Sequence, residues 1–278
     1  MVRSSTPSFE CTNSRYEHIE VLATMLSEDL MATSKHYKIH SWGGIFAQGS
    51  GGRSSAATKR MEANAFDYKQ VKSRFIFNHL CHAAARKPIR TICEVGFMAG
   101  HTAMLFAETV PTAKVVSFDL GDAGLVPWLA KQNNRLKEAY GERWLGVIKG
   151  SSMITVPRYH LAHPDFACDA VFVDGGKTTE LRYHDYVNLR NMSSPHALVF
   201  FDEATALGCV NGSYSSMGDC YYTPTGKRIH DTSTVKSAMG TWRASRAGVI
   251  RVRACEWAPG YEESDGVCVA RFVPPRHR

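Results

Sequence analysis

Residues 91–122 constrain the fold of this chain more than any other part of the sequence. An apolar run, Thr91–Val95, leads into a glycine turn, and a helix-like segment then leads to a second apolar run that ends at Asp119. This succession predicts a βαβ unit, in which glycines let the backbone approach a ligand and an acid after the second strand can hold a ribose. The glycines are spaced as Gly96-x-x-x-Gly100, and the Gly-x-Gly-x-x-Gly pattern of dinucleotide sites is absent. This spacing argues against an NAD-dependent oxidoreductase.

Strand-like and helical segments alternate along the chain from residue 91 onward. Strands are expected near residues 91–95, 114–118, 145–149, 169–173, 197–201, 249–253 and 267–273, with helices over 102–109, 127–140, 179–192 and 233–246. Such alternation predicts an α/β fold with a parallel sheet and helices on both faces. Because crossovers between parallel strands are right-handed, the carboxyl ends of the strands meet at one edge, where ligands bind.

The glycine turn carries a recognisable motif, Glu94-Val-Gly96-x-x-x-Gly100. It resembles the first motif of the class I S-adenosylmethionine-dependent methyltransferases. The resemblance implies a Rossmann-like sheet of seven strands, five parallel strands closed by an antiparallel pair, and S-adenosylmethionine as the cofactor. It also implies that Glu94 contacts the methionine part through the loop and that Asp119 accepts hydrogen bonds from the ribose hydroxyls; the alternative for each acid is a helix-capping role. The cofactor-binding residues expected are Glu94, Gly96, Gly100, Thr102, Asp119, Ser151 and Ser152.

Two later strands also end in acidic residues, one in Asp174-Gly-Gly-Lys177 and the other in Asp202-Glu203. These motifs resemble those of the metal-dependent small-molecule O-methyltransferases of the catechol, caffeoyl-coenzyme A and cephalosporin-biosynthesis types. The resemblance implies that Asp174, Asp202 and Glu203 hold Mg²⁺, Mn²⁺ or Ca²⁺, and that Lys177 is the catalytic base beside Asp174. Glu203 stands where the catechol type has Asn, and Lys177 stands where the cephalosporin type usually has His.

The chemistry explains why such residues would be useful together. Methyl transfer from a sulfonium needs alignment and a deprotonated acceptor. A divalent cation lowers the pKa of a bound hydroxyl, and oxygen ligands suit Mg²⁺, Ca²⁺ or Mn²⁺. Lys177 can act as a base only where its pKa is lowered. The alternative interpretation makes Lys177 an ion-pair partner of Asp174 or Glu180.

The N-terminal part of the chain has a different character. A helix is expected over residues 14–34 and another over 62–86, and between them the Gly- and Ser-rich stretch 41–58 predicts no regular element. We therefore divide the chain into an N-terminal helical extension, residues 1–87, whose loop is a linker or a lid, and an S-adenosylmethionine-binding methyltransferase domain, residues 88–278. The acceptor is expected to be chosen outside residues 88–203, where the resemblance ends.

Composition and charge limit the partners. Hydrophobic residues make up 44% of the chain and charged residues 21%, as in soluble globular proteins, and no apolar run reaches the ~18 residues of a membrane helix. With no secretory signal in the sequence, we expect a cytoplasmic protein with no membrane partner. The net charge of +7 is not gathered in one basic block, so a small-molecule acceptor is expected in preference to nucleic acid. A homodimer is left open.

The eight cysteines contain no Cys-x-x-Cys pair. Cys93 and Cys168 adjoin apolar runs and are expected to be small core residues. Disulfides are not implied in an intracellular protein. The pairing of four others is therefore left open: Cys209, Cys220, Cys255 and Cys268.

Two alternative functions are considered for the same fold. An RNA or protein methyltransferase would suit the positive charge and would show a contiguous basic face beside the cofactor site. A non-catalytic interaction module is the other alternative, although such a module would normally have lost the acids at its strand ends.

Overall fold

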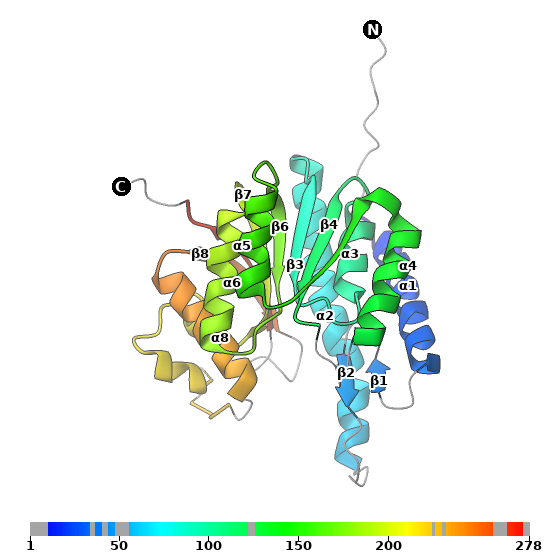
Figure 1. The fold of residues 1–278 in the computed structure, drawn as a ribbon. Helices are drawn as coiled ribbons and strands as arrows, with labels where there is room; N and C mark the ends of the chain where they lie inside the picture. Colours follow the sequence, from blue (N-terminus) through cyan, green and yellow to red (C-terminus); the bar gives the residue numbers. More distant parts are fainter. Residues whose placement is uncertain are drawn as a thin grey trace.

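The computed structural model describes residues 11–33, 37–40, 44–47, 56–121, 126–223, 226–229, 232–257 and 266–274. A seven-stranded sheet, in the order β5-β4-β3-β6-β7-β9-β8, forms its centre (Figure 1). The strands are β3 (Thr91–Val95), β4 (Lys114–Asp119), β5 (Trp144–Lys149), β6 (Cys168–Val173), β7 (Ser193–Ala204), β8 (Ile250–Trp257) and β9 (Gly266–Phe272). The predicted Rossmann-like α/β fold is confirmed.

Strand direction brings the candidate residues to one edge. The five strands β3 to β7 are parallel, whereas β9 is antiparallel to both β7 and β8. The edge at which β3 to β7 end is called the carboxyl edge below, and the opposite one the amino edge. Backbone hydrogen bonds extend the pairing into the loops of the carboxyl edge: Gly96 N–H donates to the Phe118 carbonyl and Asp174 N–H to the Val95 carbonyl, each at 2.8 Å.

Helices cover both faces of the sheet (Figure 1). One face packs against α1 (Asn13–Thr33), α2 (Ala56–Arg86), α3 (His101–Thr109) and α4 (Val126–Tyr140), and the other against α5 (Ser152–Ala162), α6 (Thr179–Asn191) and α8 (Thr232–Arg246). Two buried clusters result, because side chains alternate between the faces of a strand. In β3, Ile92 belongs to the first cluster and Cys93 to the second; in β7, Phe200 and Phe201 divide in the same way.

The structure corrects two expectations about local elements. Residues 41–58 do contain regular structure, because β2 (Gly44–Ala47) forms an antiparallel hairpin with β1 (Tyr37–His40) and α2 begins at Ala56. The helix α5 was not expected, since it contains Pro157, a residue that removes one hydrogen bond from a helix interior. In this case the flanking turns keep their hydrogen bonds and Val156 is fully buried against the sheet.

All eight cysteines are disulfide-bonded. The pairs are Cys11–Cys81, Cys93–Cys168, Cys209–Cys220 and Cys255–Cys268. The expectation that Cys93 and Cys168 are only small core residues is therefore wrong: they are buried in the core, and they also join the neighbouring strands β3 and β6. Their separation of 75 residues in the sequence gave no local signal of the pairing.

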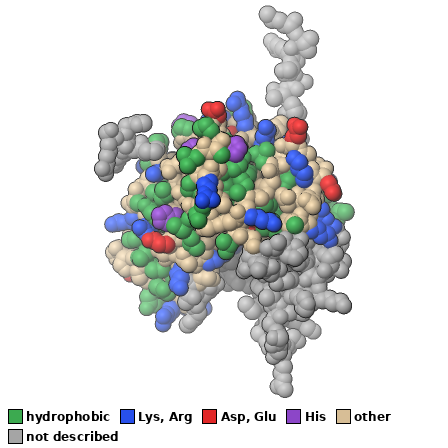
Figure 2. Space-filling model, viewed as in Figure 1, with side chains coloured by type: hydrophobic (Ala, Val, Ile, Leu, Met, Phe, Trp, Pro, Cys, Tyr) green, Lys and Arg blue, Asp and Glu red, His purple; other side chains and the backbone are tan. Residues whose placement is uncertain are grey.

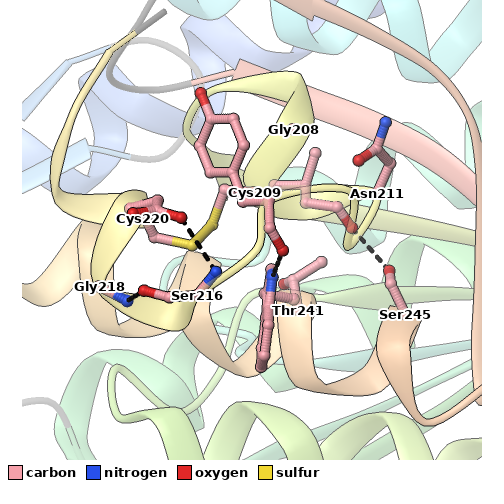
Figure 3. Close-up of a disulfide and its surroundings, with 12 residues drawn as sticks. Gly208, Cys209, Asn211, Ser216, Gly218, Cys220, Thr241 and Ser245 are labelled. Atoms are coloured by element: carbon pink, nitrogen blue, oxygen red, sulfur yellow. Dashed lines mark hydrogen bonds between the residues drawn. A yellow bond between two sulfur atoms is a disulfide. The ribbon is translucent and has the colours of Figure 1, made fainter. Parts of the chain in front are cut away.

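The Cys209–Cys220 disulfide organises the segment that follows β7 (Figure 3). It joins the short helix α7 (Leu207–Val210) to the 3₁₀ turn Met217–Tyr221. Ser216 caps that turn, accepting a hydrogen bond from Gly218 N–H at 3.0 Å. The segment is thus held by a covalent bond and local caps rather than by strand pairing.

We predict that the unreduced protein, once denatured, has no thiol that reacts with an alkylating reagent. After reduction, all eight cysteines should react. The pair variant Cys93→Ala/Cys168→Ala should lose about 4 kcal/mol of unfolding free energy, because the bond closes a long loop in the unfolded chain. Peptide mapping by mass spectrometry and denaturant titration measure these effects. Free Cys93 or Cys168 in the unreduced wild type would contradict the structure.

Candidate functional site

The glycine turn between β3 and α3 has a backbone that larger residues could not adopt. Gly96 has a φ of 99° and Gly100 a φ of 78°. A Cβ at Gly96 would lie 2.5 Å from the Asp174 carbonyl oxygen, and one at Gly100 would lie 2.8 Å from the Phe97 ring. The turn therefore packs directly against the loop after β6, and glycine is required at both positions.

Asp119 holds the turn closed. Its Oδ2 accepts hydrogen bonds from Phe97 N–H at 2.9 Å and Met98 N–H at 3.0 Å, while its Oδ1 accepts from Gly121 N–H at 2.8 Å. A carboxylate has about four acceptor positions, so capacity remains for a ribose hydroxyl. The predicted position at the strand end is thus found, together with a structural role in shaping the turn.

Glu94 is fully buried beneath the turn. Ser117 donates a hydrogen bond to its Oε2 at 2.6 Å, whereas its Oε1 is buried without a hydrogen-bond partner. Burial raises the pKa of Glu94 to about 8, assisted by the nearby charges of Asp174 and Asp119. A buried acceptor with no donor is costly unless a ligand supplies one. The Oε1 atom and the close-packed glycine turn therefore fit S-adenosylmethionine, which carries a cationic amino group.

The serines after β5 lie at the same edge but differ in their contacts. Ser151 stands at the N-cap position of α5 without a capping hydrogen bond from its side chain, and Ser152 donates a hydrogen bond to Asp185 Oδ1 at 2.5 Å. Asp185 also accepts from Gly176 N–H at 3.4 Å. Asp185 thus ties two loops of the carboxyl edge together. Roles for Ser151, Ser152 and the half-buried Thr102 at the cofactor stay predictions.

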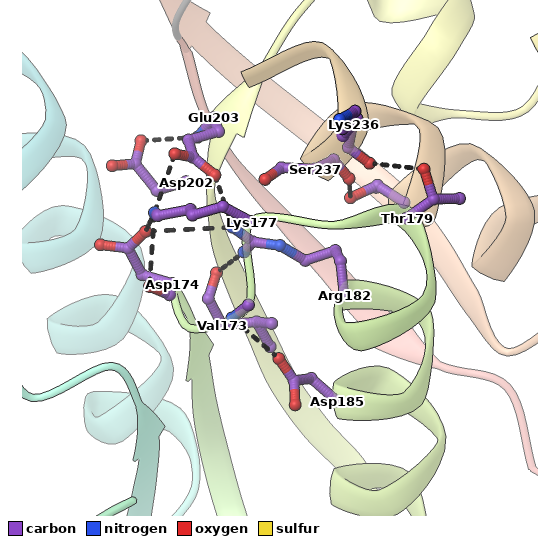
Figure 4. A network of polar contacts seen from close by, with 12 residues as sticks. Val173, Asp174, Lys177, Thr179, Arg182, Asp185, Asp202, Glu203, Lys236 and Ser237 are labelled. Carbon is purple, nitrogen blue, oxygen red and sulfur yellow. Dashed lines mark hydrogen bonds and ion pairs between the residues drawn. The ribbon is translucent and has the colours of Figure 1, made fainter. Parts of the chain in front are cut away.

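The second group of predicted residues forms an ion-pair cluster (Figure 4). Lys177 Nζ lies 2.6 Å from Asp174 Oδ1 and 2.8 Å from Glu203 Oε1. Glu203 has a φ of 62°, a left-handed backbone uncommon in a residue other than glycine and often found at functional sites. The strand end therefore aims the Glu203 carboxylate back toward the loop after β6.

Two cations that sequence patterns did not single out complete the cluster. Arg182, on α6, is fully buried; its Nη2 lies 2.7 Å from Glu203 Oε2, and its Nη1 donates to the Val173 carbonyl. Lys72, on α2, pairs with Asp202 Oδ1. Arg182 lies in the first turn of α6, shortly after the Asp174-Gly-Gly-Lys177 motif. This nearness in sequence could have indicated its contact with the cluster. Lys72 lies 130 residues before Asp202 in the sequence, so no local sequence signal indicated their contact.

The protonation of the cluster follows from these contacts. Burial disfavours a charge on Lys177, but Asp174 and Glu203 outweigh it and raise the pKa of Lys177 above its ordinary value. Burial raises the pKa of Asp174, against the effect of Lys177. The pKa of Asp202 is lowered, because Lys72 outweighs its burial. A raised pKa favours the protonated, hydrogen-bond-donating form of Lys177, and its role as a base stays a prediction.

The three carboxylates predicted to hold a cation are already paired with protein cations. No group of three potential metal-binding side chains that could hold an ion is found in the described part of the chain. Asp174, Asp202 and Glu203 contact Lys177, Lys72 and Arg182 instead. As arranged, this donor set does not fit a divalent cation, and the metal site stays a prediction without support from the geometry.

Comparison with known proteins identifies the domain. Residues 93–204 match the family Methyltransf_24, described as "Methyltransferase domain". Residues 93–204 are a methyltransferase domain. This match agrees with the class I S-adenosylmethionine-dependent methyltransferase domain that the glycine turn predicted. No curated protein matches this chain.

Solved structures agree on the fold of this chain. The cofactor-bound protein Rv0187 from MTB superimposes with a TM-score of 0.53 at 16% sequence identity, covering 81% of this chain and 93% of that one. An O-methyltransferase from Bacillus cereus in complex with SAH has a TM-score of 0.50 at 12% identity, covering 94% and 91%. At such identities the likeness shows the fold alone.

We predict that Gly96→Ala lowers the unfolding free energy by more than about 3 kcal/mol, because its Cβ would meet backbone atoms of Asp174. Gly141 is a matched control: its φ is also positive, at 57°, but nothing lies within 4 Å of its Cβ position. Gly141→Ala should cost only about 1–2 kcal/mol. Denaturant titration compares the two, and equal losses would show that the close contact carries no extra energy.

Glu94 predicts a pH dependence of stability. The folded protein keeps its proton up to a pKa of about 8, whereas the ordinary value is 4.5. Folding therefore loses stability as the pH rises through this interval, since only the unfolded chain releases the proton there. The free energy of unfolding of Glu94→Gln should fall less than that of the wild type between these pH values. Parallel pH profiles for the two proteins would refute the assigned pKa.

Proposed function

We propose that this enzyme transfers the methyl group of S-adenosylmethionine to an oxygen atom of a small molecule. The observation that carries the proposal is the direct contact between the glycine turn at Gly96 and the loop at Asp174, which starts the ion-pair cluster. A cofactor site and a set of proton-handling groups thus lie side by side at the carboxyl edge. The name of the Bacillus cereus structure, an O-methyltransferase, agrees with an oxygen acceptor.

Several groups of this chain would hold the cofactor. Glu94 Oε1, which is buried without a hydrogen-bond partner, would accept from an amino group, and Asp119 has acceptor capacity for a ribose hydroxyl. When bound, S-adenosylmethionine supplies a methyl group on a cationic sulfur, open to in-line attack by an oxygen. The close-packed turn excludes water from this side of the reaction.

The cluster would prepare the acceptor oxygen. Lys177, protonated between Asp174 and Glu203, would donate a hydrogen bond to the acceptor and stabilise its developing negative charge. Asp174, whose pKa is raised by burial, is better suited than Lys177 to receive the acceptor's proton. Arg182 would keep Glu203 in place. These roles need no metal ion.

The surface supports a small acceptor. On the face shown in Figure 2, Lys and Arg side chains are spread over the surface instead of forming one block. A nucleic-acid enzyme would be expected to gather them beside its cofactor site. Among the described residues that could line an acceptor site, Tyr222 follows the Cys209–Cys220 segment and is 48% exposed.

The disulfides bear on where the enzyme works. No helix in the described part of the chain is long and apolar enough to cross a membrane. The cytoplasmic location expected from the sequence has no finding in its favour, and four disulfides formed by all eight cysteines are typical of proteins from oxidising compartments. We therefore propose that the enzyme matures in such a compartment.

Calorimetric titration with S-adenosylhomocysteine, with and without Mg²⁺, tests the cofactor site. We expect micromolar binding that does not depend on Mg²⁺, because none of the groups proposed to bind the cofactor belongs to the ion-pair cluster. A folded protein that binds no S-adenosylhomocysteine in either buffer would favour the non-catalytic alternative. If EDTA abolished turnover and Mg²⁺ restored it, a divalent cation would take part in the mechanism.

Substitution of Asp174 tests the proposed chemistry. Asp174→Asn should bind S-adenosylhomocysteine within about twofold of the wild type but transfer methyl groups at least about 100-fold more slowly. Methyl transfer is measured with labelled S-adenosylmethionine and three probes: catechol, bulk RNA and a denatured protein mixture. The exposed Asp165 provides the control Asp165→Asn, which should keep full activity. Label in RNA or protein but not in catechol would overturn the small-molecule proposal.

A further inference from the structure

A second cavity lies at the amino edge of the sheet, away from the glycine turn. Its volume is about 810 Å³. It is bounded by the C-terminal ends of α6 and α8, the start of β8 and the residues after β9. Because α6 begins at the carboxyl edge and runs back along the sheet, its last turn lies on the opposite side of the domain from the cofactor residues (Figure 1).

The charge of this cavity is one-sided. Arg190, Arg246 and Arg251 line it, and none of the described lining residues is acidic. None of the three forms an ion pair with another described residue. The Nε of Arg190 is buried without a hydrogen-bond partner, and Arg246 stacks at 5.7 Å from the Trp242 ring centroid. A buried guanidinium nitrogen such as Arg190 Nε is normally paired.

The sheet adds a further positive charge beside the cavity. Arg251, on β8, lies directly opposite Arg271 on the antiparallel strand β9. Directly opposed residues share one face of the sheet, and like charges there are destabilising. Arg271 is fixed by donating to the His196 carbonyl. Arg271 itself does not line the cavity, so its charge acts on the site only from beside it.

The helix ends do not cancel this charge. The C-termini of α6 and α8 each contribute a partial charge of roughly −0.5, which is less than the charge of three guanidinium groups. Two polar residues, Asn211 and Ser245, also line the cavity. The Ser245 hydroxyl donates a hydrogen bond to the Val210 carbonyl at 2.6 Å (Figure 3). The remaining wall is apolar and includes Ile250, Val252 and Val273.

We propose that this cavity binds a phosphate group carried on a small apolar body, at a site separate from the methyl-transfer centre. Guanidinium forks match the oxygen geometry of phosphate and bind it in pairs of hydrogen bonds. Three such groups suit a doubly charged phosphate monoester better than a single carboxylate. The apolar wall explains why the space is larger than inorganic phosphate requires. The ligand is recognised by its phosphate and held by its apolar part.

Calorimetric titration with phenyl phosphate and with inorganic phosphate, at about 0.15 M salt to screen weak surface binding, tests the proposal. We expect saturable binding of phenyl phosphate, tighter than that of inorganic phosphate by at least tenfold. Binding of both probes with equal affinity would assign the site to free phosphate and overturn the apolar part of the proposal. No saturable binding of either would overturn it entirely.

Substitutions locate the site. Arg246→Gln and Arg251→Gln should each weaken phenyl phosphate binding at least tenfold. The control Arg253→Gln changes an exposed arginine of the same strand that does not line the cavity, and it should leave binding unchanged. Equal losses in all three variants would indicate only general attraction to a basic surface.

The same variants separate this proposal from the methyl-transfer function. All three should bind S-adenosylhomocysteine as the wild type does and show unchanged circular dichroism, because the substituted residues are exposed and lie at the amino edge. Loss of S-adenosylhomocysteine binding in Arg246→Gln or Arg251→Gln would place the cavity at the cofactor site and contradict the inference.

Discussion

The close contact between Gly96 and the Asp174 carbonyl is the constraint on which the site depends. The turn after β3 and the loop after β6 meet there without room for a Cβ. The backbone hydrogen bond from Asp174 N–H to the Val95 carbonyl, at 2.8 Å, fixes the same junction from the strand side. Both loops are held at this point. The groups of the turn after β3 that are proposed to bind the cofactor therefore keep a fixed distance from the ion-pair cluster at the loop after β6.

The cluster itself is built to preserve geometry rather than to add stability. Taking three carboxylates and three cations partly out of water costs free energy that their mutual attraction only about offsets. What the arrangement provides is direction: Arg182 is fully buried and cannot turn away, and the left-handed Glu203 backbone sets its carboxylate. Removing one partner would leave the others buried and unbalanced, which is the situation a site of this kind must avoid.

Local sequence patterns predicted the strands and turns, which depend on residues that are near in the chain. They missed contacts between residues that are far apart in the sequence. The strand alternation predicted the sheet, and the motif Glu94-Val-Gly96 predicted the glycine turn, because strands and turns are set by side-chain period and backbone freedom. Lys72 and the partner of Cys93 were missed, since their contacts span 130 and 75 residues and leave no periodic trace. The predicted metal ligands lie near one another, but only the fold reveals that protein cations already neutralise them.

The Cys11–Cys81 disulfide gives the N-terminal extension an unusual form of attachment. It ties the residue just before α1 to the last part of α2, across a sequence separation of 70 residues. A cut of the backbone anywhere between these two cysteines would yield two pieces that remain one molecule until the bond is reduced. Limited digestion would then appear complete on a reducing gel and absent on a non-reducing one, while α1 stays packed against α3. The extension would therefore survive proteolytic processing as a fixed part of the enzyme.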